Sequence, residues 1–538
     1  MEFYSILFPY KETENWQAYK NANMPDYFED LNIDQVVGNI LKGKEKYKLN
    51  AHYCCTLTDA YVINYRLDIM KDLENKDLFA AMQKFAENMS NVWEYMGQCK
   101  HATAKAQKEK WHMDSAELYV NTLLYLCEVL QKCEVKSQGF TTLRDTLENH
   151  ISGEDFTSLS LQVKKLANEF AVLKYGLTVK VSEGIGKGVV VNKYSEDQEQ
   201  PNTFIHELNE TFKKINEQDF SPGIELFTGQ WINPLEIQIL NRIVDANKPL
   251  YKQLTEFFNK YPVFVDPMIA RFENEIQFYL AFIEFAEKIK ETGITFTYPV
   301  FSSNKPDKKE VKIVDGYDLS LAIKKANTTS ESTNSALSHT IVSNDFFMKN
   351  NDNVNENIFI LTGINQGGKT TFIRTLGQIF YFASIGYPVA CKEAQLFVPN
   401  GIFIHFAQEE ALMTNSGRLR EELVRLNALF ASAQADSIIF LNEIFASTTN
   451  HDAYEMGTFM MDRFAEIGSL CIFSTHVWKL ASYGKNTVSL IAESIPVDGK
   501  QVSTYKIKRK EADEMAFGTS LAEKYKLTYD SIKERVIV

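Results

Sequence analysis

The stretch that decides the fold is IFILTGINQGGKTTFIRTLGQIF, residues 358–380. A short apolar run leads into a glycine-rich segment, and an amphipathic run begins at Lys369. Gly363, Gly368, Lys369 and Thr370 fit the pattern G-x-x-x-x-G-K-[ST] of a phosphate-binding loop. Glycines there let backbone N–H groups turn toward phosphate oxygens, and a helix N-terminus favours an anion. The stretch therefore predicts a strand, a nucleotide-binding loop and a helix, because a chance glycine turn would need neither flanking element.

Each polar side chain of this loop has an expected role. Lys369 is expected to reach the outer phosphates and to help catalysis, and the Thr370 hydroxyl is expected to ligate Mg²⁺. The other predicted nucleotide contacts are the backbone and side chains of Ile364, Asn365, Gln366, Gly367 and Thr371.

Two further apolar runs end in polar residues that suit the same site. SIIFLNEIFAST, residues 437–448, ends its strand at Asn442 and Glu443, and LCIFSTHVWKL, residues 470–480, ends with Ser474, Thr475 and His476. Ligands of parallel sheets lie at the carboxyl ends of the strands. Glu443 is therefore predicted to polarise the attacking water, Asn442 to accept from a water bound to Mg²⁺, and His476 to sense the terminal phosphate.

Composition sets the outer limits. The chain has 538 residues, 45% hydrophobic and 24% charged, with seven cysteines and a net charge of −13. This length favours two to four domains, and no run approaches the roughly 20 apolar residues that span a bilayer. The N-terminus has no basic region typical of a signal peptide, and the scattered cysteines lack metal-ligand spacing. We therefore expect a cytoplasmic protein with reduced thiols and no membrane association. The negative charge disfavours coating nucleic acid by bulk charge but leaves a local basic surface open.

Hydrophobic periodicity divides the chain into four segments. Residues 1–172 have helical periodicity, and 173–230 contain a predicted β-hairpin at 175–194. Residues 231–295 return to helical periodicity, with one stripe formed by Ile269, Phe272, Ile276, Tyr279 and Ile283 before Gly293. Residues 296–538 alternate short strands and amphipathic helices, which predicts a mainly parallel sheet covered by helices. The expected fold is multidomain: all-α segments with a small β insertion, followed by an α/β domain.

Taken together, these motifs resemble the MutS (DNA mismatch-repair) family of ABC-type ATPases. The C-terminal region from about 340 carries the specific resemblance, and 26–41 and 56–75 weakly resemble the helical core of the family. The matching stretches are TGINQGGKTTFIR (362–374), GYPVACKEAQLFVPNGIFIHFAQEE (386–410), SGRLREEL (416–423), FLNEIFASTTNHDA (440–453), STHVWKLA (474–481) and GTSLAEKYKLTYDSIKERV (518–536).

The resemblance implies an architecture and a cofactor set. It assigns 1–172 to a helical core and lever, 173–230 to a clamp-like insertion, 231–295 to returning lever helices, and 296–538 to a P-loop ATPase domain with a C-terminal helical dimerisation segment. It implies ATP and Mg²⁺, and a homodimer in which the helix starting near Asn415 closes the nucleotide of the partner through Ser416, Gly417 and Arg418. We expect Asn415 or Ser416 to cap that helix and its buried stripe to be Leu419, Leu423, Leu426 and Phe430.

The chain departs from the family pattern at several points. The family usually has an acid at Asn442, a serine at Gly417, and glycine and a basic residue at Phe445 and Ala446. The N-terminal mismatch-reading domain of the family has no counterpart in this sequence, so mismatched, branched or otherwise distorted DNA are all expected substrates.

Candidate DNA contacts are lysines that would bind phosphates without reading sequence. Lys180, Lys187 and Lys193 lie in the predicted hairpin. A second basic stretch at 99–111 carries Lys100, Lys105, Lys108 and Lys110, and solvated helix faces are the plainer interpretation of such lysines.

Three hypotheses follow. The first is a MutS-like ATPase that hydrolyses ATP, slowly because of Asn442, to drive clamp closure on DNA. The alternative is a nucleotide-gated clamp with little or no hydrolysis, acting on DNA or on a protein partner. The third, an ATPase subunit of a transporter or chromosome-maintenance complex, is disfavoured because an LSGGQ-type signature, a membrane span and sustained heptads are all missing.

Overall fold

The computed structural model describes residues 3–11, 24–179, 189–193, 234–302, 309–331, 340–351, 354–407, 415–446, 448–497 and 500–512, together with Tyr529, Ile532 and Lys533. The chain forms two compact units. Unit 1 comprises Met1–Phe3, Asn75–Val135 and Phe140–Glu273, and unit 2 comprises Tyr4–Glu74, Lys136–Gly139 and Asn274–Val538. The chain is thus multidomain and mixes helices with sheets, and the four functional segments assigned from the sequence stay predictions.

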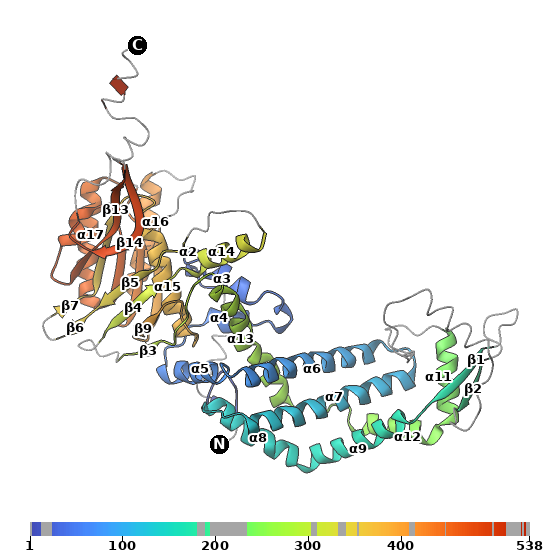
Figure 1. Ribbon diagram of the computed structural model, residues 1–538. Helices are drawn as coiled ribbons and strands as arrows, with labels where there is room; N and C mark the ends of the chain where they lie inside the picture. The colour runs from blue at the N-terminus through green and yellow to red at the C-terminus, as the bar shows by residue number, and fades with distance from the viewer. Residues whose placement is uncertain are drawn as a thin grey trace. The chain divides into compact units, whose positions relative to one another are not determined.

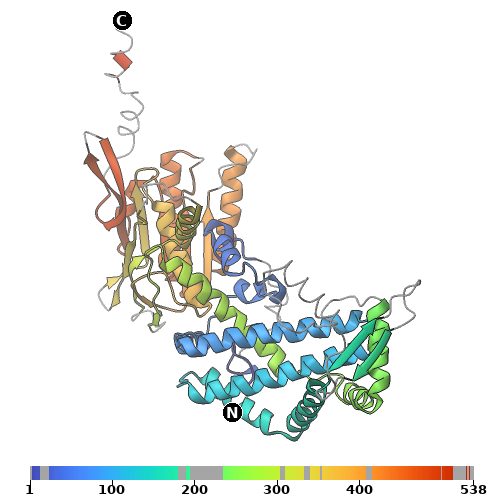
Figure 2. The same cartoon turned by 45° about the vertical axis from the view of Figure 1, so that its right-hand side comes forward.

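Unit 1 is built on two long helices, α6 and α7, which lie side by side in both views (Figures 1 and 2). The side chain of Asn75 caps α6 by accepting the backbone N–H groups of Asp77 and Leu78, and Phe85, Met89 and Leu123 are buried. The helices of this unit and the helix that leaves it are α6 (Lys76–His101), α7 (Lys105–Lys132), α8 (Gln138–Ser152), α9 (Glu154–Ala171), α11 (Pro234–Ala246), α12 (Lys248–Lys260) and α13 (Pro267–Lys290).

The predicted hairpin and the predicted long helix are both confirmed. Strands β1 (Tyr175–Val179) and β2 (Val189–Lys193) pair antiparallel, with Leu177 opposite Val191. Helix α13 buries Ile269, Phe272, Ile276 and Tyr279 completely, while Ile283 is half-buried.

Unit 2 begins with short helices and contains the main sheet (Figure 1). Its six strands have the order β10-β11-β12-β8-β13-β14, and every neighbouring pair is parallel except β13 and β14. The prediction of a mainly parallel sheet is therefore confirmed. The strands are β8 (Ile358–Gly363), β10 (Gly401–Phe406), β11 (Ser437–Asn442), β12 (Leu470–Ser474), β13 (Thr487–Val497) and β14 (Lys500–Arg509).

Helices and a smaller sheet complete unit 2. The helices are α2 (Tyr27–Asp30), α3 (Ile33–Ile40), η2 (Glu45–Tyr47), α4 (Asn50–Cys54), α5 (Ala60–Asp72), α14 (Leu319–Glu331), α15 (Lys369–Ser384), α16 (Asn415–Ser432), α17 (Asn450–Ile467) and η4 (Trp478–Ser482). A four-stranded sheet has the order β3-β9-β4-β5, from Val300–Phe301, Glu393–Leu396, Val311–Gly316 and Asn344–Met348, and β6 (Asn350–Asn351) pairs with β7 (Val354–Asn355).

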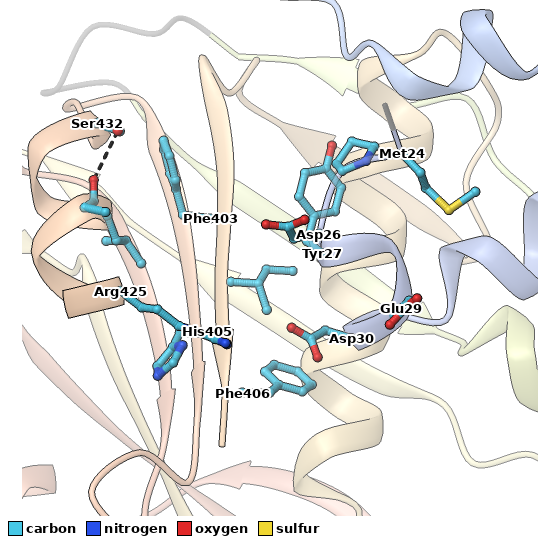
Figure 3. A pocket seen from close by; sticks show the side chains of 14 residues that line it. Met24, Asp26, Tyr27, Glu29, Asp30, Phe403, His405, Phe406, Arg425 and Ser432 are labelled. Carbon is cyan, nitrogen blue, oxygen red and sulfur yellow. Dashed lines mark hydrogen bonds between the residues drawn. The ribbon is translucent and has the colours of Figure 1, made fainter. Parts of the chain in front are cut away.

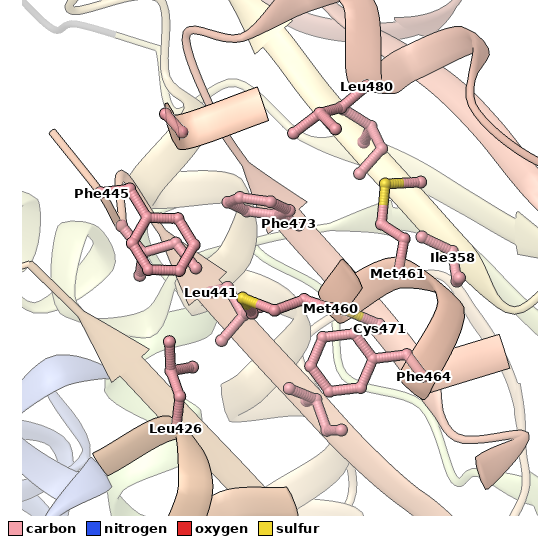
Figure 4. Close-up of a cluster of buried hydrophobic side chains, with 14 of the residues drawn as sticks. Ile358, Leu426, Leu441, Phe445, Met460, Met461, Phe464, Cys471, Phe473 and Leu480 are labelled. Carbon is pink, nitrogen blue, oxygen red and sulfur yellow. The ribbon is translucent and has the colours of Figure 1, made fainter. Parts of the chain in front are cut away.

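One hydrophobic cluster fixes the strands that carry the site. It joins β8, β11 and β12 to α16 and α17, and its members include Leu441, Phe473, Phe464, Leu426 and Phe445 (Figure 4). Successive side chains on a strand point to opposite faces of the sheet. Because Leu441 and Phe473 point into the cluster, the residues next to them in sequence point to the other face. This alternation decides which polar side chains can meet at the strand ends.

The predicted stripe of α16 is wrong at one position. Leu419, Leu426 and Phe430 pack on the cluster, but Leu423 is 45% exposed and Leu429 is buried instead. The helix is rotated so that the inward face passes through position 422 rather than 423. Glu422 therefore occupies a place that the apolar pattern had given to its neighbour.

Within the described residues, no helix is both long and apolar enough to cross a membrane. The seven cysteines are free thiols.

Candidate functional site

The loop between β8 and α15 has the backbone that phosphate binding requires. Gly363 has φ +129° and Gly368, the N-cap of α15, has φ +92°, so both lie in the region that favours glycine. A Cβ on Gly363 would stand 2.7 Å from the Cβ of Ala492 on β13. The glycines thus open the loop in front of a helix N-terminus, where backbone N–H groups and the helix dipole favour an anion.

Lys369 is buried at the first position of α15. Its Nζ donates to the carbonyl oxygen of Gly363 at 2.9 Å and lies 3.7 Å from Oε1 of Glu443. Burial lowers the pKa of Lys369, and the Glu443 carboxylate opposes that effect. The Lys369 ammonium group therefore lies against the loop that precedes α15, beside the carboxylate of Glu443, the residue directly after β11.

Glu443 stands where two neighbouring strands end. Its backbone N–H donates to the carbonyl oxygen of Ser474 at 2.9 Å, which ties the end of β11 to β12. Its Oε1 lies 3.3 Å from Nε2 of His476. The hydrogen bond with His476 lowers the pKa of Glu443, and the charge of Lys369 acts in the same direction. Three residues chosen from separate motifs, Lys369, Glu443 and His476, thus meet around one carboxylate.

Asn442 and Ser474 face each other across β11 and β12 in register. Both lie on the face opposite the cluster of Leu441 and Phe473, because side chains alternate along each strand. Asn442 Oδ1 and Ser474 Oγ are both buried, and neither has a hydrogen-bond partner among the described residues. Two orphaned oxygen atoms at the strand ends suit a hydrated cation, and the sequence had not singled out Ser474 for this.

Oxygen donors of this kind fit magnesium. No group of three or more His, Cys, Asp or Glu side chains that could cage a metal ion exists within the described ranges. Mg²⁺ usually keeps several waters and binds one or two protein oxygens together with substrate phosphates. The structure therefore offers two oxygen donors of this kind, the hydroxyl of Thr370, next to Lys369 on α15, and the amide oxygen of Asn442, whose role as ligands stays a prediction.

Of the other predicted nucleotide contacts, Ile364, Asn365, Gln366 and Gly367 lie in the loop between β8 and α15, and Thr371 lies in the first turn of α15. Ser416, Gly417 and Arg418 lie in the first turn of α16, and their assigned role toward a partner stays a prediction. Lys180 and Lys187 lie outside the described residues, as does most of 518–536, and Lys193 ends β2. In the second basic stretch, Lys105 lies 3.7 Å from Glu109 and Lys110 pairs with Asp114.

Unit 2 also has a cavity that none of the predicted site residues lines. About 720 Å³ in volume, it lies between α2, β10 and α16. Figure 3 shows Asp26 and Asp30 on one side of it and Arg425 and His405 on the other. Burial lowers the pKa of His405 to about 4, so this imidazole is neutral. A phosphate loop binds its ligand on an open surface of N–H groups, so the predicted nucleotide site is not expected to coincide with this cavity.

Comparison with known proteins supports the same segment. Residues 359–535 match the family model for MutS domain V, and this range contains Gly363, Lys369, Glu443 and His476. A DNA mismatch repair protein MutS of Brevibacillus brevis is 28% identical over 186 residues, 34% of this chain and 21% of the relative. A DNA mismatch repair protein MutS of Staphylococcus aureus is 25% identical over 288 residues, 53% of this chain and 30% of the relative. The matched region spans less than a third of the length of either relative. Through this segment, the chain is similar to proteins of the MutS family.

Proposed function

We propose that the protein is an ATP-dependent DNA-binding protein of the MutS type, which hydrolyses ATP to close on mismatched, branched or otherwise distorted DNA. The observation that carries the proposal is the meeting of Lys369, Glu443 and His476 at the carboxyl ends of parallel strands, beside a phosphate loop. That arrangement is suited to an ABC-type P-loop ATPase.

Each residue of the site has a task in the proposed reaction. Backbone N–H groups of the loop and the start of α15 hold the phosphates, and Lys369 moves from Gly363 to the outer phosphates. Glu443, ionised because its pKa is lowered, orients the attacking water in line with the terminal phosphate. Thr370, and Asn442 through a water, would hold Mg²⁺, which would supply positive charge beside the phosphate oxygens. The reacting carboxylate is thus already ordered by two neighbours.

Asn442→Asp is expected to lower the Mg²⁺ concentration for half-maximal ATP hydrolysis by about tenfold. An added carboxylate beside the metal contributes roughly 1–2 kcal/mol through a charge-assisted hydrogen bond, and 1.4 kcal/mol is a factor of ten. Turnover at saturating Mg²⁺ should rise less, because Glu443 is unchanged. Magnesium titrations of hydrolysis and of nucleotide binding measure both effects. An unchanged magnesium requirement would show that Asn442 does not face the metal.

His476→Ala is expected to move the acid limb of the pH–rate profile to higher pH. The hydrogen bond with His476 is the largest cause of the lowered pKa of Glu443, so its removal raises that pKa. Since the proposed mechanism needs the carboxylate, activity is then lost at a higher pH than in the wild type. His451→Ala, on the exposed start of α17, is the matched control. Superimposable acid limbs would contradict the assignment.

The DNA partner is supported by the match to MutS domain V and by the relatives, which are named as DNA mismatch repair proteins. The same proposal includes a homodimer closed by Ser416, Gly417 and Arg418, a cytoplasmic location, and contacts from Lys193 to the DNA backbone. Electrophoretic shifts with homoduplex, mismatched and four-way-junction DNA, each with and without ATP, test it. Retarded bands whose strength depends on ATP are expected, and no shift with any of the three would refute the DNA assignment.

A second function is favoured by Asn442, which removes the usual charge beside the metal. In that case the protein is a nucleotide-gated clamp that barely hydrolyses ATP. Steady turnover that disappears in a Glu443 variant supports the enzyme, and ATP binding without turnover supports the clamp.

A further inference from the structure

The turn that carries Glu443 has an unusual backbone. Glu443 has φ 54° and Phe445 has φ 63°, so two non-glycine residues out of three adopt the left-handed conformation. L-residues with side chains avoid this region, and it is strained for a bulky residue such as phenylalanine. Strain of this kind persists only where the surrounding contacts over-determine the conformation.

Three of the contacts that hold the turn involve the N–H of Glu443, the ring of Phe445 and the N–H of Phe445. The N–H of Glu443 is bound by the carbonyl oxygen of Ser474, as described above. The ring of Phe445 is buried in the cluster that includes Leu426 and Phe473 (Figure 4). The backbone N–H of Phe445 donates to Oε2 of Glu422 at 3.2 Å. Of these three contacts, only the third has a side-chain atom as its hydrogen-bond acceptor.

Glu422 lies on the inward face of α16. Leu419 and Leu426, three residues before it and four after it, both pack on the cluster. Positions at this spacing share one face of a helix. A carboxylate there is partly withdrawn from water, which raises the pKa of Glu422, while the N–H of Phe445 opposes the rise. A carboxylate that faces a hydrophobic cluster needs a hydrogen-bond partner, and Glu422 finds it in the backbone N–H of Phe445 in the strained turn.

We infer that Glu422 is a positioning residue for catalysis: it fixes the left-handed turn at Phe445 and thereby holds the Glu443 carboxylate between Lys369 and His476. The inference rests on the proposed ATPase function and adds to it a residue of α16. Without the acceptor, the turn is free to relax toward an ordinary backbone conformation, and the carboxylate leaves its place. A displacement of about 1 Å at a reacting group costs on the order of 100-fold in rate.

A matched pair of variants tests this. Glu422→Gln keeps an oxygen that accepts the N–H of Phe445, whereas Glu422→Met has a similar length and no such oxygen. We expect the methionine variant to lower kcat for ATP hydrolysis by about 10- to 100-fold. Its affinity for a non-hydrolysable ATP analogue should stay within about threefold, because the phosphate loop is untouched. The glutamine variant should retain kcat within about threefold. Glu421→Ala, one residue earlier and paired on the surface with Arg425, is the control and should match the wild type.

The outcomes separate the inference from the proposed function. Turnover in the wild type that vanishes in Glu443→Gln establishes the ATPase independently of Glu422. If the wild type hydrolyses ATP and the methionine variant has the same kcat, Glu422 is not a positioning residue. Equal losses in kcat and nucleotide affinity, or equal losses in the methionine and glutamine variants, would also overturn the inference. Thermal melting verifies folding, and Glu422→Ala replaces the methionine variant if that chain does not fold.

Discussion

Replacing Lys369 with alanine is expected to weaken ATP binding by at least about 100-fold. The ammonium is buried, and in the absence of nucleotide it is held by the carbonyl oxygen of Gly363 and lies near Glu443. Removing one partner of a buried, charged hydrogen-bonded pair costs about 2–5 kcal/mol, and each 1.4 kcal/mol is a factor of ten. The substitution also leaves Glu443 facing the incoming phosphates without a neutralising cation.

Titration with a fluorescent ATP analogue, with and without Mg²⁺, measures this loss. Lys392→Ala removes an exposed lysine just before β9 and should leave the affinity unchanged. Lys369→Ala and the wild type should have similar melting temperatures without nucleotide, because Lys369 contacts mainly its own loop. Unchanged ATP affinity in Lys369→Ala would refute the site.

The sequence was sufficient to predict which of these residues lie close together where its signals are local. The phosphate loop needs glycines at fixed positions before a helix, so Gly363 and Gly368 could be assigned from spacing alone. The same holds for the apolar strands that end at Asn442 and Ser474. Their meeting in space follows from a general property of parallel sheets, whose carboxyl ends share one edge. Lys369, Glu443 and His476 are therefore close together for a reason that can be stated in advance.

The remaining parts depend on contacts that no local pattern contains. A helical stripe has a tolerance of one position, so Leu423 fitted the apolar pattern as well as Leu429 did. Two contacts decide the rotation of α16: its packing on the hydrophobic cluster, and the hydrogen bond from the N–H of Phe445 to the carboxylate of Glu422. The left-handed turn at Phe445 was likewise out of reach, because phenylalanine is not a residue that signals positive φ.

Charge patterns were the weakest guide. Lysines at 99–111 suggested a basic surface, but the structure pairs Lys105 and Lys110 with acids one turn away and places Nζ of Lys108 5.4 Å from the centre of the Phe258 ring. A lysine on a helix finds an acid at i+4 more readily than a distant phosphate, and the sequence alone does not distinguish the two. Binding measurements with salt dependence are the proper test for DNA contacts.

Glu443→Gln is expected to lower ATP hydrolysis by about 100-fold or more while ATP remains bound. Glutamine keeps the size of the side chain and an oxygen that accepts from His476, but it cannot take a proton from water and carries no charge. Lys369 stays in the loop and remains available to the phosphates, since its bond to Gly363 does not involve Glu443. The loss should therefore fall on kcat and spare nucleotide affinity, in contrast to Lys369→Ala.

Single-turnover hydrolysis and equilibrium binding on the same preparation separate these effects, with Glu455→Gln on the exposed face of α17 as control. The variant also tests the role of the nucleotide on DNA. If hydrolysis drives closure of the clamp, as proposed, Glu443→Gln with ATP should dissociate from DNA faster than the wild type, and Lys369→Ala should not respond to ATP at all. If Glu443→Gln turns over ATP at the wild-type rate, the base lies elsewhere and the reading of Asn442–Glu443 as the catalytic strand end is wrong. If neither the wild type nor Glu443→Gln turns over ATP, yet both bind it, the protein is a clamp gated by ATP binding alone. The charge missing at Asn442 would then explain the lack of hydrolysis.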